Sequence, residues 1–179
     1  MQRKVGLLRG INVGGKRKIR MADLKAMCEK IGLKNVQTYI QSGNLIFNSD
    51  RKNAELENAL EKAIAEKFGY DVPVIVRREN ELENSISNNP FIEKTAELKR
   101  LHLTFLKEEP ILENLEKTRT YNYEPDQFKI EDKEVFIYCE GKYHESKLTN
   151  NFFEKQLKVG ATTRNWRTVL KLSELCKKE

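Results

Sequence analysis

Cysteine and histidine are scarce in this chain of 179 residues, which contains three cysteines and two histidines. Cys28, Cys139 and Cys176 are odd in number, lie far apart and show no C-x-x-C spacing. They predict neither a disulfide framework nor a zinc site, and they favour a reducing compartment. The two histidines, His102 and His144, add no spacing that is typical of metal ligands, so we expect no metal.

A long apolar segment is also missing. The N-terminus carries charges but not the apolar core of a signal peptide, and no apolar run approaches the length of a membrane-spanning helix. We therefore expect a cytoplasmic protein without a membrane partner. The length suffices for one domain or two small repeats, which bury roughly 70% of the unfolded surface and need no disulfides to fold.

Acidic residues are absent from the first twenty positions, which hold seven lysines and arginines. The remaining chain has 26 basic and 27 acidic residues, so this opening segment accounts for the net charge of +6. The segment from Arg164 onward has five basic residues and two acids. If the two ends meet in space, they form one positive surface that attracts phosphates or nucleic acid. Alternatively, the lysines and arginines serve only solubility.

The spacing of apolar residues predicts a similar order of elements in both halves of the chain. In the first half we expect strands at 4–9, 35–41, 44–48 and 74–77, and helices at 21–31, 53–68 and 79–88. In the second half we expect strands at 101–105, 128–130 and 135–139, a short helix after Pro110, a helix at 150–157, and a last helix capped by Thr162 or Thr163. This order fits an α+β fold with helices packed on a mainly antiparallel sheet, as in ferredoxin-like units.

Three blocks of sequence resemble a known family. They are residues 7–15 (LLRGINVGG), 38–44 (TYIQSGN) and 162–166 (TTRNW), with further matches at 146–148, 168–169 and 171–172. The blocks are similar to an uncharacterised bacterial family, the domain of unknown function 1697. The resemblance implies two β-α-β-β-α-β ferredoxin-like repeats, which we place at 1–90 and 91–179 in one compact unit. It implies no activity, substrate or catalytic residue.

The segment 10–17 (GINVGGKR) nearly matches the phosphate-binding loop G-x-x-x-x-G-K-[ST]. Arg17 replaces the hydroxyl that would hold magnesium in such a loop. The first predicted helix also begins late, near Met21, so its N-terminus is not at the glycines. We therefore do not expect a P-loop nucleotidase.

The same segment is compatible with a less specific hypothesis, an anion-binding loop. Gly14 and Gly15 permit positive φ and close backbone approach, so a nest of N–H groups could face an anion. Under the alternative interpretation the segment is a glycine-rich turn in which Asn12 caps its own backbone and the lysines are solvated. Under the first interpretation three cations neutralise the anion, Arg9, Lys16 and Arg17, and Asn12 is a further ligand-binding residue.

Two other stretches supply further candidate ligand-binding residues. In the first predicted hairpin, Tyr39 can stack on a base or ring, and Gln41 or Asn44 can hydrogen-bond the edge of that ring. Under the alternative interpretation these residues only form and stabilise the turn. Arg164 is expected in the first turn of the last helix, where a bound anion would offset its unfavourable position in the helix dipole. Trp166 would contact the same ligand. The alternative is a buried arginine paired with an acid, with Trp166 in the core.

The combined hypothesis is a cytoplasmic protein that binds a phosphate-bearing ligand, a nucleotide or nucleic acid, through the basic glycine-rich loop, with no cofactor. One alternative is an enzyme that acts on a small anionic metabolite at this loop, with Tyr39, His144 or a nearby carboxylate as acid or base. A thiolate pair of Cys139 and His144 is a weaker form of it. The other alternative is a structural scaffold without a ligand. The oligomeric state stays open, although an edge strand at 74–77 could pair with another copy.

Overall fold

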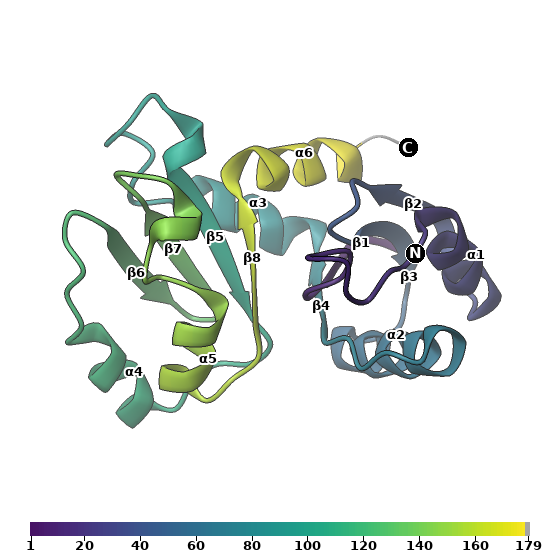
Figure 1. Ribbon diagram of the computed structural model, residues 1–179. Helices are drawn as coiled ribbons and strands as arrows, with labels where there is room; N and C mark the ends of the chain where they lie inside the picture. The colour runs from purple at the N-terminus through teal and green to yellow at the C-terminus, as the bar shows by residue number, and fades with distance from the viewer. Residues whose placement is uncertain (178–179) are drawn as a thin grey trace. The chain divides into compact units, whose positions relative to one another are not determined.

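The structure, a computed structural model, describes residues 1–177 and divides the chain into two compact units (Figure 1). The first unit comprises Met1–Glu83 and the chain from Leu172 onward, and the second comprises Asn84–Lys171. Each unit contains a four-stranded antiparallel sheet. Among the described residues, no helix has the length and apolar character that crossing a bilayer requires.

The first unit contains one β-α-β-β-α-β series of elements. Its strands lie in the order β2-β3-β1-β4, and β1 pairs with both β3 and β4. Gln2 pairs with Ser49 at one end of the sheet, and Leu8 pairs with Val74 at the other end. The elements are β1 (Gln2–Leu8), α1 (Met21–Lys30), β2 (Lys34–Tyr39), β3 (Asn44–Ser49), α2 (Asn53–Phe68) and β4 (Val74–Arg78).

The second unit repeats the series, and its strands lie in the equivalent order β6-β7-β5-β8. This duplication confirms the predicted α+β fold with two ferredoxin-like repeats. The elements are β5 (Leu101–Leu106), α4 (Leu112–Arg119), β6 (Gln127–Glu131), β7 (Glu134–Tyr138), α5 (Asn150–Leu157) and β8 (Ala161–Asn165). The remaining helices are α3 (Glu79–Ser87), α6 (Trp166–Lys177) and two short 3-10 segments, η1 (Leu98–Arg100) and η2 (Tyr143–Glu145).

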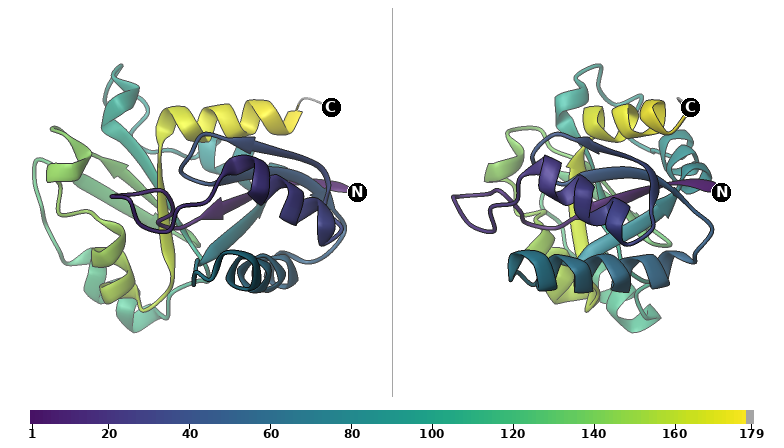
Figure 2. Two further views of the ribbon diagram at one scale, coloured as in Figure 1. Left: turned by 45° about the vertical axis from the view of Figure 1, so that its right-hand side comes forward. Right: turned by 90° about the vertical axis from the view of Figure 1, so that its right-hand side faces the viewer.

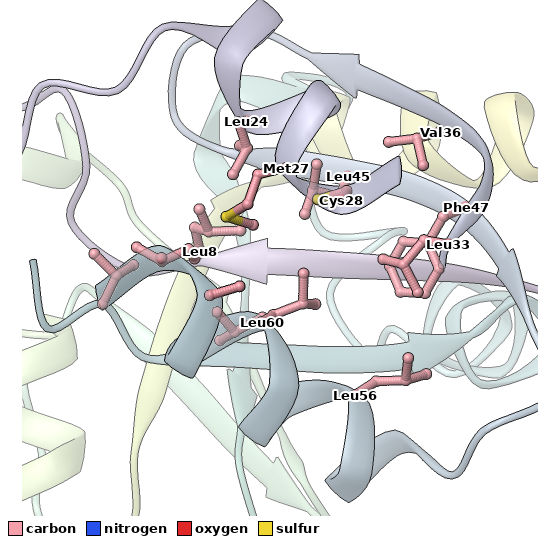
Figure 3. Packing of buried hydrophobic residues seen from close by; sticks show 14 of the residues in the cluster. Leu8, Leu24, Met27, Cys28, Leu33, Val36, Leu45, Phe47, Leu56 and Leu60 are labelled. Atoms are coloured by element: carbon pink, nitrogen blue, oxygen red, sulfur yellow. The ribbon is translucent and has the colours of Figure 1, made fainter. Parts of the chain in front are cut away.

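One hydrophobic cluster joins α1 and α2 to the sheet of the first unit (Figure 3). The four-residue spacing of Leu56, Leu60 and Ile64 places these side chains on one face of α2, and all three are fully buried. Burying a leucine or isoleucine of this kind contributes about 2 kcal/mol. Their partners in the cluster include Leu8, Leu24, Met27, Leu45 and Phe47.

The second unit has its own hydrophobic cluster beneath α5. Phe153 and Leu157 from α5 pack with Leu106 from β5 and Ile137 from β7. The hydroxyl oxygen of Thr149 caps α5 by accepting a hydrogen bond from the Phe152 backbone N–H. Each repeat therefore has a separate core between its sheet and its helices.

The structure corrects the predicted start of the last helix. Thr162 and Thr163 do not cap it, because residues 161–165 form β8, which pairs with β5. The last helix, α6, begins at Trp166, and the Asn165 side-chain oxygen accepts a hydrogen bond of 2.9 Å from the Thr168 N–H. Threonine suits both a helix cap and a strand, and pairing with a strand distant in sequence decides between them here.

The turn between β2 and β3 packs against the end of β1 through Gly43. The Leu8 N–H donates a hydrogen bond of 2.9 Å to the Gly43 carbonyl. Gly43 has a φ of +84°, and a Cβ added there would lie 2.7 Å from Cδ1 of Ile11 and 2.8 Å from Cβ of Leu8. Both the backbone conformation and the available space therefore require glycine.

Replacing Gly43 by alanine should lower the free energy of unfolding by about 2–4 kcal/mol, because the new methyl group overpacks the junction and strains the left-handed backbone. Gly14→Ala is the matched control, since Gly14 has a φ of +58° but open space around its Cα. It should cost only about 1 kcal/mol. Urea denaturation of both variants would measure this difference, and equal losses would contradict the steric argument.

Candidate functional site

The basic loop, residues 9–20, follows β1 and contains a small hairpin. The Asn12 N–H donates to the Arg17 carbonyl at 3.2 Å, and the Lys16 N–H donates to the Val13 carbonyl at 3.0 Å. Gly14 and Gly15, with φ of +58° and +74°, occupy the two turn positions, as a two-residue type I′ hairpin requires. The turn itself thus explains the glycine pair. Figure 2 shows this purple loop extending beyond the end of β1.

Asn12 fixes the base of this hairpin. Its side-chain oxygen accepts a hydrogen bond of 2.9 Å from the Ile19 N–H. Its amide nitrogen donates to the Ile19 carbonyl at 3.0 Å and to the Gln41 carbonyl at 2.8 Å. Both amide protons are therefore used within the protein. Asn12 ties the basic loop to the turn between β2 and β3, and its φ of +55° is one that asparagine tolerates well.

Three cations of the basic loop face solvent: Lys16, Lys18 and Arg20. Within the described part of the chain, none of them forms an ion pair with a carboxylate. Arg9 and Arg17 are half-buried, and the Arg17 guanidinium donates a hydrogen bond of 3.4 Å to the Arg9 carbonyl. Lys16, Lys18 and Arg20 therefore present positive charge to solvent at neighbouring positions of the loop.

The turn between β2 and β3 lies beside the basic loop. Asn44 is fully buried, and its amide donates to the Tyr39 carbonyl at 2.9 Å and to the Ser42 hydroxyl at 3.1 Å, so it stabilises the turn. Tyr39 is half-buried and Gln41 is exposed. Ile40 is 46% exposed with a φ of +51°, which is rare for a β-branched residue.

Arg164 and Trp166 belong to the second unit. Arg164 lies on β8 instead of in a helical turn, and its guanidinium donates to the Thr162 hydroxyl at 2.8 Å and to the Thr163 carbonyl at 3.0 Å. Burial lowers the pKa of this guanidinium to about 10, so it stays charged at neutral pH. Trp166 is fully buried. We therefore build the candidate site from the first unit alone.

Sequence reasoning did not assign Lys18 and Arg20 to the site. The sequence does contain a feature that points to these two residues, because both belong to the opening segment that has no acidic residue. Sequence reasoning also missed two exposed apolar residues, Val13, which is 65% exposed, and Ile40. Isolated apolar residues in turns do not belong to the regular apolar spacing from which helices and strands are predicted.

Cys139 and His144, the pair considered for catalysis, lie in the second unit together with His102. Cys139 is buried, and burial raises the pKa of its thiol to about 11, which keeps it protonated at neutral pH. His144 is exposed, with Nε2 3.6 Å from a carboxylate oxygen of Glu145. His102 is buried against the Tyr143 ring at a centroid distance of 4.3 Å, and burial lowers its pKa to about 4.

Comparison with known proteins finds a matching family model and similar solved structures. A family model described as "protein of unknown function (DUF1697)" matches residues 1–136. The solved structure of the conserved bacterial protein SP0830 from Streptococcus pneumoniae is similar, with a TM-score of 0.78 and 26% identity over 98% of this chain and 99% of that chain. The comparison with curated proteins found no match.

Replacing Asn12 should destabilise the first unit even in the absence of a ligand. Asn12→Gly keeps the backbone conformation but removes three hydrogen bonds, which should lower the free energy of unfolding by about 2–3 kcal/mol. Asn12→Ala should cost about 1 kcal/mol more, because alanine resists the positive φ. Chemical denaturation tests this, and unchanged stability in both variants would refute the anchoring role.

His102 should make stability depend on acid pH. Its folded-state pKa of about 4 lies below the ordinary value of 6.5, so between these values the unfolded chain binds a proton that the folded protein does not. The free energy of unfolding should therefore fall as pH decreases from 6.5 to 4, by up to about 3 kcal/mol from this residue. His102→Phe should remove this component, whereas His144→Asn at the exposed histidine should retain it. Denaturation curves with the same pH dependence for wild type and His102→Phe would contradict the assignment.

Proposed function

The chain belongs to the DUF1697 family of proteins of unknown function, and we propose that it binds a phosphate-bearing polymer, a nucleic acid, through the basic loop. The observation that carries the proposal is the group of exposed cations without internal counter-ions on a protruding hairpin. Such cations bind phosphates by releasing condensed counter-ions, so the interaction depends on salt and little on sequence.

The shape of the loop favours a polymer over a small molecule. A pocket for a small ligand encloses most of the ligand surface, whereas a two-residue hairpin turn presents a convex tip. Val13 at this tip is 65% exposed, and Gly14 and Gly15 are exposed beside it. A backbone of regularly spaced phosphates can lie along such a tip without being enclosed.

The adjacent turn supplies groups that can contact bases. Gln41 is exposed and its carbonyl is joined to Asn12, so its side chain emerges next to the basic loop. Tyr39 is half-buried nearby, and tyrosine rings stack on unpaired bases. Asn12 and Asn44 support this surface from within the protein. We leave Arg164 and Trp166 out of the proposed surface because both are buried in the second unit.

The double variant Lys16→Gln, Lys18→Gln should weaken binding of a single-stranded RNA or DNA by about tenfold at low salt, because two phosphate contacts are lost. The slope of log K against log salt concentration should decrease in magnitude by about 1.4, at about 0.7 per contact. Fluorescence anisotropy over a range of salt concentrations measures both quantities.

Lys30→Gln, Lys34→Gln is the matched control, since both lysines are exposed in the same unit and have no acidic partner among the described residues. If both double variants lost the same affinity for the nucleic acid, net charge alone would explain the effect, and the proposed role of the basic loop would be refuted. Tight binding of a mononucleotide with little salt dependence would favour a small-ligand site. It would also favour the alternative hypothesis that the protein is an enzyme. No binding of any phosphate compound would favour a scaffold.

A further inference from the structure

A cavity of about 950 Å³ lies in the first unit, away from the basic loop. Arg3 near the start of β1 lines it, whereas the basic loop follows the end of β1, about 20 Å along the strand. Residues from several other elements complete the lining, among them Gln37 of β2, Asn48 of β3, Asn80 of α3 and Lys177 of α6. This volume lies within the range of natural small-molecule sites.

Arg3 is held in a fixed position but keeps unused donors. Its Nη1 donates to the Asn35 carbonyl at 3.0 Å and to the Asn48 side-chain oxygen at 2.9 Å. Its Nε is buried without a hydrogen-bond partner, and among the described residues no group accepts from its Nη2. Nη2, unlike Nε, is not buried, so its two N–H groups are the donors that a carboxylate or phosphate in the cavity can reach.

The other lysines and arginines of the lining are paired with acidic residues. Each has a carboxylate partner nearby: Lys25 has Glu29 at 3.9 Å, Arg78 has Glu81 at 3.2 Å and Lys177 has Glu83 at 2.9 Å. Arg3 forms no such pair within the described chain. Arg3 is therefore the lysine or arginine of the described lining that has no carboxylate partner, and Glu79 in the lining disfavours ligands with a high negative charge.

The rest of the lining indicates the character of the ligand. Five side-chain amides of the described chain line the cavity, among them Gln37 and Asn80, which are exposed and are able to hydrogen-bond hydroxyl or carbonyl groups. Among the described residues, the lining contains no aromatic ring on which a base could stack. A polar, hydroxyl-bearing molecule matches this surface better than a flat apolar one.

We infer that this cavity is a second binding site, for a hydrophilic small molecule whose single carboxylate or phosphate group accepts hydrogen bonds from Nη2 of Arg3. Amide side chains contact the hydroxyl-bearing remainder of the molecule. The site is independent of the basic loop, because it uses a different end of the sheet and no residue of the loop.

The direct test observes Arg3 itself. In ¹⁵N-labelled full-length protein, titration with inorganic phosphate and with acetate should shift the Nε–H resonance of Arg3 and the backbone amides of Asn35 and Asn48 in a saturable way. No saturable shift with either anion would overturn the proposal. Shifts confined to residues 12–18 would overturn it as well, because they would assign anion binding to the basic loop.

Calorimetry with ribose 5-phosphate, gluconate and uncharged ribose identifies the anionic group and tests the arginine. At least one charged probe should bind while ribose does not. Arg3→Gln should weaken that binding by about tenfold to a hundredfold, and Arg3→Lys should restore only part of it, because lysine keeps the charge but not the planar guanidinium that Asn35 and Asn48 position. Equal affinity in wild type and Arg3→Gln would refute the role of Arg3.

Two controls separate this site from other effects. Arg51→Gln removes an exposed arginine of the same unit that lies outside the cavity lining and whose side chain donates only to the Glu55 carbonyl. The charged probe should bind this variant with the same affinity as wild type. Lys16→Gln, Lys18→Gln should likewise leave affinity unchanged. A loss in that variant would place the probe at the basic loop and refute an independent site.

Discussion

Close packing at the end of β1 determines where the candidate surface forms. Gly43 leaves room for Leu8 and Ile11, and its carbonyl accepts the Leu8 N–H. This contact sets the distance between the basic loop and the β2–β3 turn, and Asn12 then joins the two segments through the Gln41 carbonyl. The exposed cations depend on this buried junction, because a short hairpin would not keep one position without it.

The duplication shows which feature is specific to the first unit. Both units place a connecting segment between their first strand and first helix. In the first unit this segment has five cations and no acid, whereas in the second unit residues 107–111 contain one lysine and two glutamates. Because the fold is shared, the fold does not require the basic charge. Packing of the shared fold therefore does not account for the charge.

Local patterns predicted most of the fold. The four-residue apolar spacing gave α2 with the bounds that the structure has, because periodicity reports directly on a helix face. The pattern failed at β8, where pairing with β5 decides the conformation of Thr162 and Thr163. The charge of the candidate loop was likewise visible in the sequence. The anchoring bonds of Asn12 and the surroundings of Arg3 were not, because they join residues that are distant along the chain.

The state of each cation determines how it can bind an anion. The Arg164 guanidinium is buried and donates to Thr162 and Thr163, and the loss of solvation lowers its pKa. Lys16 is exposed to solvent, so an anion that binds it must compete with water and salt. Arg3 lies between these cases, since its Nη1 donates to Asn35 and Asn48 while its Nη2 has no acceptor among the described residues. A preorganised donor loses little side-chain entropy on binding, so an anion at Arg3 should be held more tightly and with less salt dependence than one at Lys16.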